Sequence, residues 1–204
     1  MSEKKINFDN GSTSFTKAQA LGKAVDEFLE HGAYNINRGN YTSAYDIQDV
    51  VYQTRCLLGE LFGCGNQRHV VFTPGVTYSL NFFIHGFLNP GDHILVSSLE
   101  HHGVMRPLTA RMMKGEILFD SIPSDEEGNL DLNVVESMLR PDTKAILVTN
   151  ASNVCGTILP IRELGRICRK HNLIFAVDAA QTAGVLPVST KDDGIDFLAF
   201  AGHK

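Results

Sequence analysis

The chain has 204 residues, a net charge of −5 and 43% hydrophobic residues, a composition typical of a folded globular protein and not of a disordered one. The acidic balance, without any block of Lys or Arg, gives no reason to expect nucleic-acid binding. The first residues contain no apolar signal segment and no apolar run is a plain membrane span, so we expect a cytoplasmic protein that does not bind membranes. Its four cysteines show no CxxC spacing and are expected to be free thiols.

Helical and strand-like segments alternate along the chain. We expect two helices first, at residues 16–32, with Gly32 closing the helix, and at 44–63, with Ser43 as N-cap. The first helix has an apolar face, formed by Ala20, Ala24, Val25 and Phe28. Strand-like runs follow at 68–73, 93–98, 116–122, 144–150, 173–179 and 196–201, with helical segments between them at 77–88, 104–115, 132–139 and 161–172. Strands this apolar predict a three-layer α/β/α fold with a mainly parallel sheet.

The stretch "FTPGVTYSLN" is the first of five polar motifs where a strand is expected to end. Pro74–Gly75 forms a tight turn, and a helix begins near Val76 or Thr77. Gly75 lets the backbone approach a ligand, while the free N–H groups and the dipole of the helix favour an anion. The Thr77 hydroxyl adds a donor. This motif is a candidate phosphate site; the alternative is an ordinary β–α turn.

The stretch "SSLEHHGVMRP" places Glu100, His101 and His102 directly after a buried strand. Adjacent histidines point in different directions and make a poor metal pair, and we expect no metal site. A neutral imidazole in this place could stack on a planar ligand or shuttle a proton. The alternative is a pair of loop histidines without a role.

Three further motifs follow later strands. Asn150 and Asn153 offer donors and acceptors, although Asn is common in any loop. Asp178 ends a buried strand, where a carboxylate is costly unless a cation or donors meet it; it is a candidate counter-ion for a ring nitrogen or, alternatively, a helix N-cap. Lys204 ends an apolar strand and is a candidate Schiff-base amine, unless it faces solvent.

The five motifs together describe one ligand. It has a phosphate, a ring that can be stacked, a phenolic oxygen that needs donors, a pyridine nitrogen that needs a carboxylate, and an aldehyde that needs a lysine. That ligand is pyridoxal 5'-phosphate (PLP).

The sequence resembles the class V aminotransferase family of fold-type I PLP enzymes, and within it the cysteine desulfurase and selenocysteine lyase branch. The segments that carry the resemblance are "FDNGSTSFTK", "NRGNY", "FTPGVTYSLN", "EHHGVMRP", "SNVCGTILP", "VDAAQTAGVLPV" and "DFLAFAGHK". The resemblance implies an N-terminal arm and helix at residues 1–30 and part of the PLP-binding large domain at 31–204. It also implies that the rest of the large domain and a small domain lie beyond residue 204.

The resemblance also implies roles for individual residues. Lys204 would hold PLP covalently and move protons, and Asp178 would keep the pyridine nitrogen protonated. Asn153 and Gln181 would bond the ring oxygen, and His101 would stack on the ring and act in acid–base steps.

Phosphate and substrate contacts are implied in the same way. Thr77, with the backbone of Gly75 and Val76, would bind the phosphate together with His203. Arg38 in "NRGNY" matches an active-site arginine of some members. Ala201 replaces the usual Ser, which removes one phosphate-binding hydroxyl and leaves the identity of the substrate undetermined.

The function expected from the resemblance is that of a cysteine desulfurase, which converts L-cysteine to L-alanine and passes sulfur to an enzyme cysteine persulfide. The substrate-carboxylate arginine and the nucleophilic cysteine would lie outside this chain, so we expect these residues alone to be inactive; Cys155 does not match the nucleophile and is expected to pack. The full-length enzyme would be a homodimer serving a sulfur-acceptor protein. Alternatives are another class V enzyme, such as an aminotransferase or selenocysteine lyase, and a non-catalytic binding protein that keeps the fold.

Overall fold

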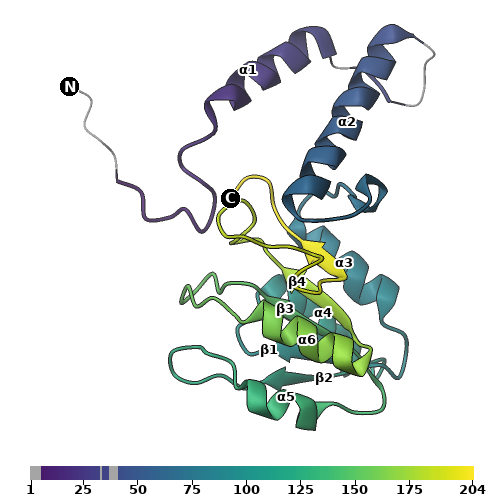
Figure 1. Cartoon of the computed structure of the whole chain (residues 1–204), viewed down its shortest axis with the longest axis vertical. Coiled ribbons are helices and arrows are strands. Elements are labelled where there is room, and N and C mark those ends of the chain that lie inside the picture. The colour runs from purple at the N-terminus through teal and green to yellow at the C-terminus, as the bar shows by residue number, and fades with distance from the viewer. Residues whose placement is uncertain (1–5, 33, 37–40) are drawn as a thin grey trace. The chain divides into compact units, whose positions relative to one another are not determined.

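The computed structural model describes residues 6–32, 34–36 and 41–204 (Figure 1). The chain divides into two compact units, Met1–Val71 and Phe72–Lys204. Arg38 lies outside the described residues.

The first unit is helical, as predicted. It contains α1 (Gln19–Glu27), a π-helical turn (Phe28–Gly32) and α2 (Thr42–Leu61). The N-cap of α2 is Tyr41 and not Ser43, because the backbone N–H groups of residues 44 and 45 already bond to the Tyr41 carbonyl.

The predicted apolar face of α1 is not buried, since no residue of this helix is buried in the structure. Val25 and Phe28 each keep 46% of their surface exposed. An apolar stripe shows that a helix face can be buried, and not that an element is present to cover it.

The segment predicted as a first strand, at 68–73, is not a strand. A short 3₁₀ turn (Gln67–His69) begins it, where the Asn66 side chain accepts a hydrogen bond from the Arg68 N–H, and residues 70–73 enter no β-ladder. Val71 is 70% exposed and Phe72 50% exposed. Apolar β-branched residues favour a strand, but a strand also needs a neighbour with which to exchange hydrogen bonds.

The second unit is built on a parallel sheet of five strands, and the other five predicted strands are confirmed. The strands are β1 (His93–Ser97), β2 (Leu118–Ile122), β3 (Thr143–Thr149), β4 (Ile174–Asp178) and β5 (Phe197–Ala199). Their order across the sheet is β2-β1-β3-β4-β5, and every neighbouring pair is parallel.

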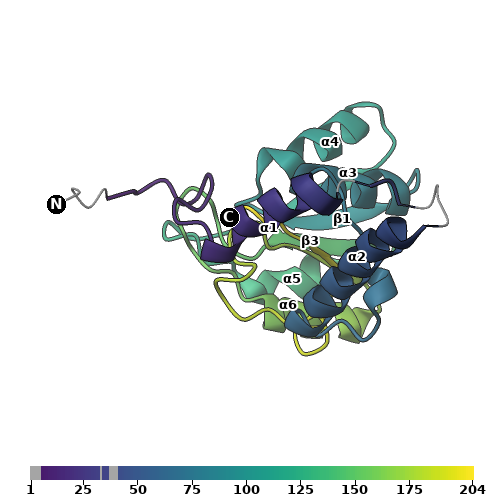
Figure 2. The ribbon, with the colours of Figure 1, turned by 90° about the horizontal axis from the view of Figure 1, so that it is seen from above.

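Helices cover both faces of this sheet, which confirms the three-layer α/β/α prediction. Figure 2 shows α3 (Val76–Phe87) and α4 (His102–Met113) on one side of the strands, and α5 (Leu132–Met138) and α6 (Ile161–His171) on the other. Across the sheet, the connection from β1 to β2 runs toward the β2 edge. The connections from β2 to β3 and from β3 to β4 run toward the opposite, β5 edge. Right-handed crossovers therefore place α4 opposite to α5 and α6.

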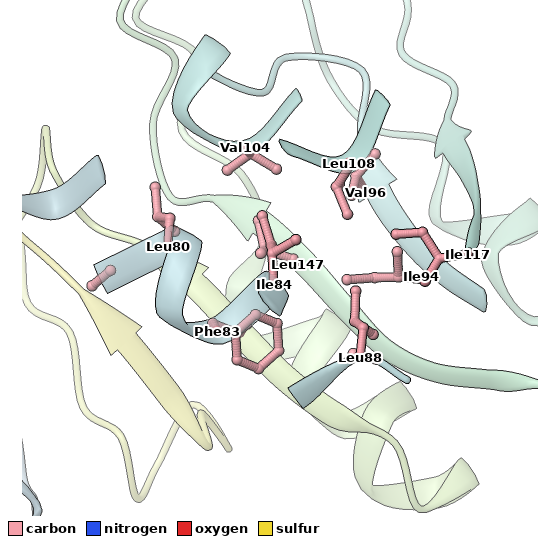
Figure 3. Close-up of a cluster of buried hydrophobic side chains, with 13 residues drawn as sticks. Leu80, Phe83, Ile84, Leu88, Ile94, Val96, Val104, Leu108, Ile117 and Leu147 are labelled. Atoms are coloured by element: carbon pink, nitrogen blue, oxygen red, sulfur yellow. The ribbon is translucent and has the colours of Figure 1, made fainter. Parts of the chain in front are cut away.

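The core between the sheet and the α3–α4 layer is apolar and closely packed (Figure 3). Leu80 and Ile84 of α3 meet Ile94 of β1, Leu108 of α4 and Leu147 of β3, all with no exposed surface. Burying a side chain of this size contributes about 1.5–3 kcal/mol. This layer fixes α3 and α4 on the sheet.

A buried arginine closes the far end of α3. Nη1 of Arg111, in α4, donates to the carbonyl oxygens of Ile84 (2.6 Å) and Leu88 (3.0 Å), and its Nε donates to Glu116 at 2.9 Å. The last carbonyls of a helix have no partner within it, so these bonds satisfy the end of α3. They also fix the position of the helix along its axis.

Candidate functional site

The polar residues singled out from the sequence lie at the carboxyl edge of the sheet. β3 and β4 end level with each other, because Thr149 pairs with Asp178, and Ser97 ends β1 beside them. The connection from β1 leads away on one side to β2, whereas β3 lies on its other side. Such a switch point at the carboxyl ends is where open α/β sheets bind ligands.

The first turn of α3 forms an anion cradle. Gly75 is the N-cap, and its carbonyl accepts hydrogen bonds from the N–H groups of Tyr78 (3.0 Å) and Ser79 (3.3 Å). The N–H groups of Val76 and Thr77 precede these first helical bonds and are available to an anion. A Cβ atom placed on Gly75 would have no described atom within 4 Å, so the backbone borders open space there. The turn thus places backbone donors at the edge of open space.

His101 lies next to this cradle. It is the N-cap of α4, and its Nδ1 accepts a hydrogen bond from the Gly103 N–H at 2.9 Å. Nδ1 is thus an acceptor, and the neutral ring carries its proton on Nε2. A Cβ atom placed on Gly103 would lie 3.2 Å from His101 Nδ1 and 3.5 Å from Thr77 Oγ1. The starts of α3 and α4 therefore bring Thr77 and His101 to the same place.

Asp178 is buried, with 3% of its surface exposed, at the end of β4. Its Oδ1 accepts a hydrogen bond from the Ala180 N–H at 2.9 Å, but a turn and not a helix follows, so Asp178 is not a helix N-cap. Burial raises the pKa of this carboxyl, and the Ala180 N–H and the charges of His101 and Lys204 lower it. Asp178 thus lies within electrostatic reach of both His101 and Lys204, which the sequence separates by 103 residues.

The remaining candidates lie on turns at the strand ends. Gln181 is half-buried in the turn after β4, Asn153 is exposed in the turn after β3, and His203 is exposed just before the half-buried Lys204. Ala201 is buried, with 7% of its surface exposed.

All four cysteines are free, as expected, but the prediction that Cys155 packs was wrong. Cys155 is exposed in the turn after β3. Hydrogen bonding to Ser152 and to Thr157, whose Oγ1 lies 3.3 Å from Sγ, lowers the pKa of the thiol to about 7. The thiol contacts the hydroxyl groups of this turn and not an apolar core, and the residue type alone does not predict such contacts.

Glu100 was given no role from the sequence, although the structure buries its carboxyl group among the site residues. Oε1 accepts hydrogen bonds from the Ser97 hydroxyl and from the Thr149 N–H, the latter at 2.6 Å. Oε2 is buried and has no hydrogen-bond partner in the described part of the chain. Burial raises the pKa of Glu100 to about 8, and the Asp178 carboxyl adds to this rise. The signal that singled out Asp178, an acid directly after a buried strand, could have found Glu100 as well.

Among residues 6–32, 34–36 and 41–204, no group of three or more His, Cys, Asp and Glu side chains could hold a metal ion. A search of the same residues finds no helix with the length and apolar character that crossing a membrane requires.

Comparison with solved structures shows that the fold is that of fold-type I PLP-dependent enzymes. An apo cysteine desulfurase from Thermococcus onnurineus NA1 matches with a TM-score of 0.89 and 33% identity, over 97% of this chain and 49% of that chain. A structure described as SspA in complex with cysteine shares the fold, with a TM-score of 0.88 and 23% identity, over 98% of this chain and 57% of that one.

The family model for Aminotransferase class-V matches residues 6–204, and the chain belongs to this family. A probable cysteine desulfurase from Pyrococcus abyssi is 31% identical over 207 residues, covering 100% of this chain and 51% of that protein. Another, from Mycolicibacterium paratuberculosis, is 30% identical over 203 residues, covering 98% of this chain and 30% of that protein. The chain thus spans about half of the first of these relatives and about a third of the second. Members of the family are PLP-dependent.

Proposed function

We propose that this chain is the cofactor-binding part of a PLP-dependent cysteine desulfurase, which converts L-cysteine to L-alanine and passes the sulfur to an enzyme cysteine as a persulfide. The observation that carries the proposal is that Asp178, at the end of β4, lies within electrostatic reach of both His101 and Lys204. The names of the relatives at 30% and 31% identity support the choice of reaction within the family.

The residues present fit PLP at its phosphate end. Thr77 Oγ1 and the N–H groups of Val76 and Thr77 would bind the phosphate, which would occupy the open space at Gly75, and His203 would add a donor. Ala201 offers only a methyl group in this region, so the phosphate would be held by one hydroxyl fewer than in members with serine. The dipole of α3 favours the negative charge.

The residues also fit the ring. A buried carboxylate is stable when a cation meets it, and a protonated pyridine nitrogen is such a cation for Asp178. His101 would stack on the ring, and its Nδ1 bond to the Gly103 N–H fixes the orientation of the imidazole. Asn153 and Gln181 would donate to the ring oxygen.

Bound PLP supplies an electron sink that stabilises negative charge on the Cα atom of an amino acid. Lys204 Nζ would hold the cofactor covalently and, once released from it by the amino group of cysteine, would remove the proton from Cα. His101 Nε2–H is the nearby group that can donate or accept a proton in later steps. A cysteine thiolate would then attack the sulfur of the substrate, so that an S–S bond forms as the Cβ–S bond breaks. The electron pair of the broken bond would stay with the carbon skeleton, which takes up protons and leaves as alanine. We further propose that the full-length enzyme is a homodimer that delivers sulfur to an acceptor protein and that Arg38 contacts the substrate.

The test is a titration of the purified 204-residue chain with PLP, followed by absorbance at the edge of the visible range. We expect a bound-cofactor band that is lost in Lys204→Ala and retained in Lys191→Ala, a matched change at an exposed lysine. Absence of the band from the unmodified chain would contradict the proposal and favour a non-catalytic binding protein. Product formation from cysteine that depends on an added 2-oxo acid would identify an aminotransferase instead.

A further inference from the structure

The Glu100 carboxyl group bridges two strands at the switch point of the sheet. Its Oε1 accepts from the Ser97 hydroxyl at the end of β1 and from the Thr149 N–H at the end of β3. Asp178, at the end of β4, is the charged group whose field acts on it. Glu100 also directly precedes His101, so the bridge fixes the backbone from which the imidazole projects.

The two oxygens of Glu100 have different surroundings. Oε1 receives two donors, whereas Oε2 is buried without a hydrogen-bond partner in the described part of the chain. An ionised Glu100 would thus hold a buried charged oxygen without a donor, beside a second carboxylate. Two neighbouring buried carboxyls do not both ionise at neutral pH, because each charge opposes the other.

Asp178 is the member of this pair with a positive charge near it. The charge of Lys204 and the Ala180 N–H favour the ionised form of Asp178, whereas the Asp178 charge opposes ionisation of Glu100. The proton that the pair retains therefore belongs on Glu100.

We propose that Glu100 is a positioning residue that works as an uncharged carboxylic acid: it joins the ends of β1 and β3, orients His101, and leaves Asp178 as the charged member of the pair. This inference rests on the proposed function only where PLP is concerned. The uncharged state is a property of the chain itself and is tested without the cofactor.

The cofactor-free test compares the pH dependence of unfolding of Glu100→Gln with that of the unmodified chain. Glutamine has the shape of a protonated glutamic acid and can accept the same two hydrogen bonds. An unfolded Glu ionises near pH 4.5, whereas folded Glu100 keeps its proton up to about pH 8. The folded state then binds more protons than the unfolded state, so the Glu100 contribution to stability falls as pH rises from 4.5 to 8.

We therefore expect the difference in denaturation midpoint, variant minus unmodified chain, to shift steadily in favour of Glu100→Gln between pH 5 and pH 7.5. Glu126→Gln, at an exposed glutamate, should show a difference that does not change with pH. A constant difference for Glu100→Gln, or one that favours the unmodified chain at higher pH, would overturn the proposal.

Two further measurements guard against a variant that does not fold and separate this inference from the proposed function. Infrared spectra of the chain labelled with ¹³C-glutamate should show a protonated carboxyl band at pH 7 that disappears as pH passes about 8; no such band at pH 7 refutes the uncharged state.

The second measurement is the affinity for PLP. Glu100→Gln should keep this affinity within about twofold, whereas Glu100→Ala should weaken it at least tenfold; equal loss in both variants refutes the positioning role. If the unmodified chain gives no PLP band, the proposed function fails and the positioning role fails with it, while the infrared and unfolding data still decide the charge state.

Discussion

Thr149 and Asp178 lie opposite each other in the register of β3 and β4, and each is the last residue of its strand. The Thr149 N–H is bonded to Glu100, and the Asn150 N–H donates to the Asp178 carbonyl at 2.8 Å. Asp178 is thus placed by strand pairing, whereas Glu100 lies in the turn after β1 and its side chain bonds to the end of β3. A shift of one residue in this register would turn Asp178 to the opposite face of the sheet.

We predict that Asp178→Asn weakens PLP binding without unfolding the chain. The asparagine Oδ1 can still accept from the Ala180 N–H, but the charge that would meet the ring nitrogen is gone. A charge-assisted hydrogen bond contributes roughly 1.5–3 kcal/mol more than none, so the dissociation constant should rise roughly 10- to 100-fold. Titration followed by absorbance measures it, with Glu126→Gln as the matched control; an unchanged affinity would remove Asp178 from the site.

Arg111→Met is predicted to destabilise the chain by about 3 kcal/mol, since breaking a buried ionic group away from its partners typically costs this much. The carbonyls of Ile84 and Leu88 would lose their shared donor. Urea denaturation measures the loss. Glu116→Gln, which removes only the partly exposed partner, should cost about 1 kcal/mol. Equal effects of the two changes would show that the carbonyl bonds contribute nothing.

Gly165 should not tolerate alanine, although alanine is the better helix former. A Cβ atom at Gly165 in α6 would come within 1.9 Å of the Asp193 carbonyl oxygen. We expect Gly165→Ala to destabilise the chain by about 1–3 kcal/mol. Gly86→Ala, in α3 and with no described atom within 4 Å of the new Cβ, should be neutral or stabilising by up to about 1 kcal/mol. Thermal unfolding of both variants tests the contrast, and a stabilised Gly165→Ala would disprove the close contact.

Two cysteines should differ widely in reactivity. The pKa of Cys155 is lowered to about 7 by its hydrogen bonds, whereas burial raises the pKa of Cys168 to about 12. Because the thiolate is the nucleophile, alkylation of Cys155 should reach half its maximal rate near pH 7, while Cys168 stays unmodified in the folded chain. Peptide mass spectrometry distinguishes the two sites. Ser152→Ala should move the Cys155 profile to higher pH, because Ser152 is the largest cause of the lowered pKa; an unmoved profile would rule out the role of the Ser152 hydroxyl.

Much of the second unit could be predicted from the sequence because its strands are buried on both faces and read as continuous apolar runs. The site candidates followed from one rule, that polar residues directly after such runs meet at the carboxyl edge. The rule does not predict whether a buried carboxyl group is charged. The rise in the pKa of Glu100 comes from its burial and from the charge of Asp178, 78 residues away in the sequence, and no local pattern reveals such surroundings.

Two segments outside the site show the same limit of local sequence patterns. Residues 70–73 have the composition of a strand but enter no ladder, and the apolar face of α1 is left exposed. In both cases the local sequence favours a strand or a buried helix face. Whether a neighbouring strand or a covering element is present depends on distant parts of the chain.

The Arg111 contacts imply that affinity for an anion can be altered from the opposite end of α3. The helix has 12 residues and is about 18 Å long, so its two ends are joined by one continuous set of helical hydrogen bonds. If the bonds to Ile84 and Leu88 are lost, side-chain packing alone fixes the helix along its axis, and any shift of the helix moves the N–H groups of Val76 and Thr77. A residue that lies far from the proposed phosphate site would then affect its geometry.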